Sequence, residues 1–95
     1  MDIAAPYGTS IYASAGGTVE FAGWKGSYGY CVLIDHGNGY KTRYAHCSSL
    51  KVSTGQKVSQ GQVIAAVGAT GFATGNHCHF EVIKNGTKVN PANYL

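Results

Sequence analysis

The chain has 95 residues, of which 44% are hydrophobic and only 12% charged, and its net charge is +3. This length allows one domain that buries roughly 60–65% of its unfolded surface. No apolar run is long enough to cross a bilayer, so we expect no membrane insertion by this domain. Lys and Arg form no cluster of the nucleic-acid-binding type, so we expect no nucleic-acid partner. The three cysteines lack CxxC spacing and predict buried thiols rather than a disulfide framework.

The composition and the spacing of turn residues predict an all-β fold. The chain has 14 Gly and seven Tyr, and together with many Val and Ile they favour short strands joined by tight turns. No amphipathic helical period persists anywhere. We therefore expect one compact domain over residues 1–95, with an antiparallel sheet and a groove bounded by Gly-rich loops.

In chain order, Pro6 and Gly8 mark a turn, and two strands are predicted at 11–13 and 18–22. A Gly-rich loop follows at 24–29. The next run is almost wholly apolar, which predicts a central strand covered on both faces; it reads Tyr30-Cys31-Val32-Leu33-Ile34.

The stretch 35–39 is predicted to be a hairpin connection, because Asn-Gly at 38–39 is a favoured pair for two positive φ angles. His36 lies in this stretch and is interpreted as a local structural residue. The return strand is predicted at 40–46. Simple alternation places four of its side chains on one face: Tyr40, Thr42, Tyr44 and His46. The two tyrosines have two interpretations, as part of the floor of the groove or, more commonly for tyrosine in a strand, as packing residues.

The stretch 52–67 predicts two short strands around Gly turns. Its centre, 55–64, is similar to half of a biotinyl- or lipoyl-carrier domain. A carrier needs a lysine at a hairpin tip in a Met-Lys-Met or Asp-Lys context, and neither occurs here, so this function is set aside. A loop of small residues at 68–75 leads to His77, and Asn85-Gly86 is the last predicted hairpin turn.

The run from His77 to Val82 alternates polar and apolar residues, as a half-buried strand does. His77, His79 and Glu81 are expected on one face, with the apolar side chains packed behind them. Two imidazoles on such a strand are costly to bury without partners, which points to metal binding and proton transfer. A cysteine peptidase is disfavoured, because each thiol beside a histidine in sequence points to the opposite face of its strand.

Five motifs span essentially the whole chain: Asp2-Ile3-Ala4-Ala5-Pro6, Gly37-Asn38-Gly39, Tyr44-Ala45-His46, Gly55-Gln56-Lys57-Val58 and Thr74-Gly75-Asn76-His77-Cys78-His79-Phe80-Glu81. Together they resemble the lysostaphin-type zinc endopeptidase domain of bacterial cell-wall hydrolases. The resemblance implies a Zn²⁺ cofactor bound by Asp2 and His79, and two catalytic histidines, His46 and His77, beside the water that zinc activates. It also implies hydrolysis of peptide bonds in the stem or cross-bridge peptides of peptidoglycan, in an extracellular, cell-envelope or phage-particle setting.

The family's first zinc ligand is a histidine four residues before the aspartate, a position that would precede Met1. A catalytic zinc usually has three protein ligands, so we expect an N-terminally truncated domain with weak or absent activity by itself. The alternative is a non-catalytic relative that binds cell wall or regulates other wall hydrolases. Retention of Asp2, His46, His77 and His79 favours the enzyme, since a binding protein has no chemical need for all four.

Overall fold

The computed structural model describes residues 2–70, 75 and 77–91, with His77 described by its backbone alone. It confirms the all-β prediction, and the helical element in this part of the chain is one 3₁₀ turn, η1, at Gly26–Tyr28. The strands are β1 (Asp2–Ala4), β2 (Ser10–Tyr12), β3 (Gly17–Trp24), β4 (Tyr30–Gly37), β5 (Tyr40–Leu50), β6 (Lys57–Val58), β7 (Val63–Val67), β8 (His77–Lys84) and β9 (Thr87–Val89).

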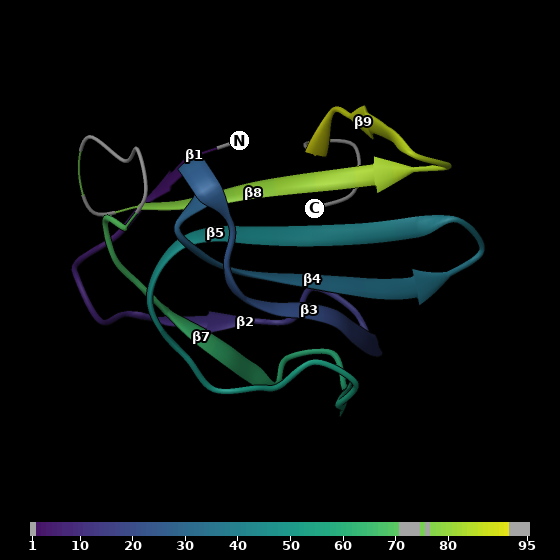
Figure 1. Cartoon of the computed structure of the whole chain (residues 1–95), viewed down its shortest axis with the longest axis horizontal. Helices are drawn as coiled ribbons and strands as arrows, with labels where there is room; N and C mark the ends of the chain where they lie inside the picture. The colour runs from purple at the N-terminus through teal and green to yellow at the C-terminus, as the bar shows by residue number, and fades with distance from the viewer. Residues whose placement is uncertain (1, 71–74, 76, 92–95) are drawn as a thin grey trace.

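The main sheet has the strand order β1-β8-β5-β4-β3-β6, and each pairing is antiparallel. β5 belongs to two layers of the fold. Its first part pairs within the main sheet, and its last residues pair with β7, which in turn pairs with β2. Figure 1 shows β8, β5 and β4 side by side, with β2 and β7 to one side of them. On the other edge of β8, β1 pairs with its beginning and β9 with its end.

Both predicted Asn-Gly hairpin turns are present. Asn38 and Gly39 have φ of 53° and 80°, and Asn85 and Gly86 have φ of 51° and 82°, the positive values that tight hairpins require. His36 lies at the end of β4 rather than in the turn. Its Nδ1 is 2.7 Å from the Gly16 carbonyl oxygen and its Nε2 is 2.6 Å from the Thr42 hydroxyl, contacts that support the structural role predicted for it.

The core lies between one face of the main sheet and the layer of β2 and β7. It contains Val32 and Ile34 from β4, Ile64 from β7, and the predicted inward-facing residues of β8, Cys78, Phe80 and Val82. The apolar run of β4 is buried on both faces of the sheet, as predicted, with all four residues from Cys31 to Ile34 shielded from solvent.

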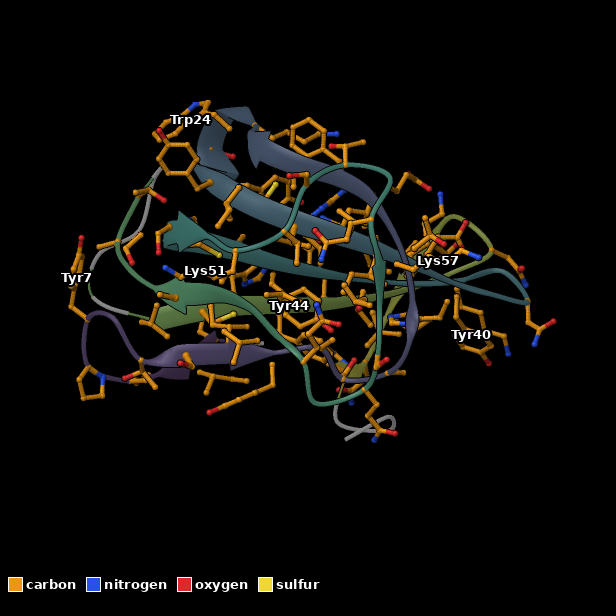
Figure 2. All side chains as sticks on the ribbon, turned by 90° about the horizontal axis from the view of Figure 1, so that it is seen from below. Tyr7, Trp24, Tyr40, Tyr44, Lys51 and Lys57 are labelled. Atoms are coloured by element: carbon orange, nitrogen blue, oxygen red, sulfur yellow. The ribbon has the colours of Figure 1, made fainter. Side chains whose placement is uncertain are left out.

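Tyr44 lies in this core, which confirms the packing interpretation and excludes the floor of a groove for this residue. It is 2% exposed, its ring packs against Phe80 with centroids 5.3 Å apart, and Figure 2 shows it in the interior. Its hydroxyl accepts hydrogen bonds from the Thr42 hydroxyl (2.9 Å) and the Ser14 backbone N–H (3.0 Å). Tyr40 is partly buried and also packs against the core.

Within the described residues, no helix has the length and apolar character needed to cross a membrane. The groove predicted over the histidine strands stays a prediction, since residues 71–74, in one of its expected walls, lie outside the described part of the chain.

The three cysteines are free thiols and all are buried. Burial raises the pKa of Cys47 to about 12 and that of Cys78 to about 11, and it also raises the pKa of Cys31. Because the thiolate is the reactive form, native protein should react slowly with a chromogenic disulfide reagent at neutral pH and completely after unfolding. Rapid reaction of the folded protein would show that the thiols are not in the core.

Candidate active site

The pairing of β1 with β8 brings Asp2, near the start of the chain, beside His79. Asp2 lies directly opposite His79 in the register, and directly opposite residues share one face of an antiparallel pair. The Asp2 Oδ1 is 2.7 Å from Nδ1 of His79. The Asp2 side chain is 63% exposed and that of His79 is 28% exposed. The two predicted metal ligands are therefore adjacent, on the face of β8 opposite the core.

A β-bulge brings His46 to the same face. The ladder between β4 and β5 passes from Val32 opposite Tyr44 to Tyr30 opposite Cys47, so β5 carries one extra residue there. His46 has φ of 61°, and its ring centroid is 6.1 Å from that of His79. The prediction that His46 shares a face with Tyr44 is wrong, because the bulge interrupts the alternation.

Thr70 fixes the orientation of the His46 ring. The Thr70 carbonyl accepts a hydrogen bond from Nδ1 of His46 at 2.7 Å, and a carbonyl can only accept, so Nδ1 carries the proton. The Thr70 hydroxyl donates to the Cys47 carbonyl at 2.6 Å and accepts the Tyr30 backbone N–H at 3.2 Å. A neutral His46 ring therefore carries its lone pair on Nε2.

The structure places His77 at the start of β8, with its backbone opposite Ala4. Its side chain lies outside the described part of the protein, so its predicted catalytic role stays a prediction. No group of three or more His, Cys, Asp and Glu side chains arranged to hold a metal occurs among the side chains that are described.

Glu81 is the centre of a polar cluster on the site face of β8. Its carboxylate is 8% exposed and lies 2.9 Å from Nε2 of His79. Three further donors reach it: Arg43 Nη1 at 3.0 Å, Lys88 Nζ at 3.2 Å and the Tyr28 hydroxyl at 3.2 Å. Burial alone would raise the pKa of the Glu81 carboxyl, but the hydrogen bonds from His79 and Lys88 and the charges of Lys88 and Arg43 together hold it below its usual range.

The Tyr28 ring covers this cluster. It stacks on the His79 ring with an interplanar angle of 25° and centroids 6.3 Å apart, and the Arg43 guanidinium lies 4.6 Å from its centroid. Sequence alternation placed Glu81 beside His79 but did not find Tyr28, Arg43 or Lys88. Arg43 could have been found from the sequence, because its charge is opposite to that of Glu81 and the two residues lie directly opposite each other on β5 and β8. Nothing in the sequence marked Tyr28, which comes from the 3₁₀ turn.

The model of Peptidase family M23 matches residues 1–91 of this chain. The chain belongs to peptidase family M23. The peptidoglycan DD-endopeptidase ShyA of Vibrio cholerae is 47% identical over 89 residues, which are 94% of this chain and 21% of ShyA. The chain thus spans about a fifth of the length of the curated relatives it matches.

Solved structures of other peptidases have the same fold. The catalytic domain of lysostaphin from Staphylococcus simulans is 29% identical with a TM-score of 0.91, over 98% of this chain and 74% of that one. A zinc-containing peptidase from Vibrio cholerae is 41% identical with a TM-score of 0.89, over 93% of this chain and 27% of that one. The resemblance to the lysostaphin-type domain is confirmed, and zinc is present in a structural relative.

We predict that Arg43→Met lowers the free energy of unfolding by about 2–3 kcal/mol. The loss of a partner from a buried ion pair costs roughly 3–5 kcal/mol, and here His79 and Lys88 remain beside Glu81. The matched control is Lys41→Met on the same strand, whose 2.7 Å pair with Glu20 is solvent-exposed and should matter little. Urea unfolding of both variants measures the two changes in the free energy of unfolding. Equal decreases in the two variants would show that the pair of Arg43 with Glu81 contributes no more to stability than the exposed pair.

Proposed function

We propose that this M23 chain, over residues 1–95, is the peptidase domain of a zinc-dependent endopeptidase. Its substrates are the stem or cross-bridge peptides of peptidoglycan, which places its action in the cell envelope. The observation that carries the proposal is the convergence of Asp2, His79 and His46 on one face of the sheet. The names of M23 relatives, including a peptidoglycan DD-endopeptidase, support the substrate class.

Asp2 and His79 fit zinc as ligands. An imidazole nitrogen and a carboxylate oxygen are donors that zinc prefers, and here Nδ1 and Oδ1 face each other at 2.7 Å. A histidine four residues upstream of Asp2, as in the lysostaphin-type domain, would supply the third ligand. Bound zinc lowers the pKa of a coordinated water to about 7 and polarises the scissile carbonyl.

His46 is oriented for proton transfer in this reaction. With its proton on Nδ1, held by the Thr70 carbonyl, Nε2 of the neutral ring can accept a proton from the attacking water. The protonated ring can instead donate a hydrogen bond to the oxyanion that forms. His77 is proposed as the second histidine, so that one ring takes the proton while the other stabilises the developing charge.

We predict that His79→Ala abolishes both zinc binding and hydrolysis, because it removes a ligand. His46→Ala should keep most of the zinc affinity and lower turnover by about 10²–10⁴-fold, the usual contribution of a general acid or base; His77→Ala should do the same. A zinc competition titration and the release of peptides from purified cell wall measure the two effects. Both are run on this chain and on a version extended upstream to include the third ligand.

His36→Gln is the matched control, since His36 is hydrogen-bonded to Gly16 and Thr42 rather than placed at the site. It should keep activity while the protein stays folded. Unchanged zinc affinity in His79→Ala, or wild-type turnover in His46→Ala, would contradict these roles. Wall binding without hydrolysis by the extended protein would favour the non-catalytic alternative.

A further inference from the structure

A basic cavity of about 350 Å³ lies on the main sheet beside the cluster around Glu81. Its lining contains four of the chain's seven Lys and Arg residues: Lys25, Lys41, Arg43 and Lys88. Arg43 lies directly opposite Glu81 in the register, and Lys41 lies directly opposite Ile83. Opposite residues share one face of an antiparallel pair. The cavity therefore lies on the same face of the sheet as the candidate active site.

Three of the four cations share two carboxylates. Arg43 and Lys88 both contact Glu81, at 3.0 and 3.2 Å. Lys41 pairs with Glu20 at 2.7 Å, and both side chains of this pair are substantially exposed. Exposed pairs of this kind are held weakly, so a ligand can compete for Lys41 at little cost.

Lys25 is the fourth cation, and no carboxylate pairs with it among the described residues. Its side chain is exposed, and its ammonium lies 5.7 Å from the centroid of the Phe21 ring. The Nε of Arg43 is buried and has no hydrogen-bond partner in the described part of the chain. The cavity thus has an excess of two positive charges and an unused donor. A concave surface with one sign of charge concentrates ligands of the opposite sign.

The lower lining of the cavity is apolar. Leu33 of β4 and Ile83 of β8 both line it, and Leu33 lies directly opposite Arg43. A ligand that fits this lining has an aliphatic part for the two apolar side chains and an anionic end for the cations. A carboxylate suits the planar fork of an arginine better than a single oxygen does.

We propose that this cavity binds a carboxylate of the wall peptide, carried on an aliphatic side chain. The inference rests on the proposed function, because it adds a subsite for the proposed peptide substrate. Ile83 is four residues beyond His79 on β8, a distance of about 13 Å at the rise of a strand. In an extended peptide that follows β8, the carboxylate therefore lies about four residues from the bond that is cleaved.

The competing explanation is a cluster of charges that only stabilises the sheet. The charge reversal Lys25→Glu separates the two, because Lys25 is exposed and has no ion pair to lose within the described residues. Lys51→Glu is the matched control. Lys51 is also exposed, and its backbone N–H donates to the Ile64 carbonyl, which places it beside β7 in the other layer. Both variants change the net charge by the same amount.

The first experiment is calorimetric binding of two synthetic wall peptides to the metal-free chain at low salt. The peptides differ only in one side chain, which ends in a carboxylate or in its primary amide. Wild type and Lys51→Glu should bind the acidic peptide about 10-fold more tightly, as expected for hydrogen bonds to a charged group. Lys25→Glu should reduce this preference about 3–5-fold, the contribution of one exposed charge pair, and added salt should reduce it in every protein.

Three results would overturn the proposal. The first is a wild type that binds both peptides equally or binds neither. The second is an equal loss of preference in Lys25→Glu and Lys51→Glu, which would indicate net charge alone. The third is tighter binding of a glycerol phosphate polymer than of the acidic peptide, which would assign the cavity to a wall polyanion.

The second experiment measures hydrolysis of the same two peptides by the upstream-extended protein with zinc. Lys25→Glu should raise KM for the acidic peptide about 3–5-fold and keep kcat, since the cavity binds substrate away from the reacting atoms. Binding is measured without metal, so a chain that prefers the acidic peptide but hydrolyses neither after extension would refute the proposed function alone. An active protein with equal KM for both peptides would refute the role of the cavity alone.

Discussion

The antiparallel register between β5 and β8 is the constraint on which the rest of this molecule depends. It places Tyr44 opposite Phe80 in the core and Arg43 opposite Glu81 on the other face. Because side chains alternate with a period of two, a slip of one residue would send Phe80 to solvent and Glu81 into the core. The apolar packing of Tyr44 against Phe80 therefore holds the polar cluster around Glu81 in place on the opposite face of the sheet.

The bulge in β5 interrupts this alternation at His46. In a regular strand Tyr44 and His46 would lie on the same face, and the core already holds Tyr44. The extra residue and the left-handed conformation of His46 turn its imidazole toward His79. Backbone conformations of this kind are unfavourable for a residue other than glycine and persist where the surroundings impose them. Here the Thr70 bonds to His46, Cys47 and Tyr30 impose it.

The sequence was sufficient for the features that follow from short-range periodicity. The Asn-Gly hairpins, the buried run of β4 and the two faces of β8 were all predicted, because each depends on residues close together in the chain. The bulge was not predicted, since nothing in Tyr44-Ala45-His46 marks an extra residue in a ladder with β4. The contact between Asp2 and His79 was expected only through the family resemblance. A three-residue strand with exposed side chains carries too little pattern to be recognised, and its position depends on pairing with a strand more than 70 residues away.

The two carboxylates beside His79, those of Glu81 and Asp2, differ in how firmly the surrounding structure holds them. On the Glu81 side, the carboxylate is buried, is held by Arg43 and Lys88, and is covered by Tyr28, so its position does not require a metal. On the Asp2 side, the carboxylate is exposed and its 2.7 Å contact with Nδ1 leaves no room for an ion between the two atoms. The proposed zinc site would therefore combine a firmly held histidine with an exposed aspartate, and Asp2 would be the ligand with more freedom to adjust to an ion.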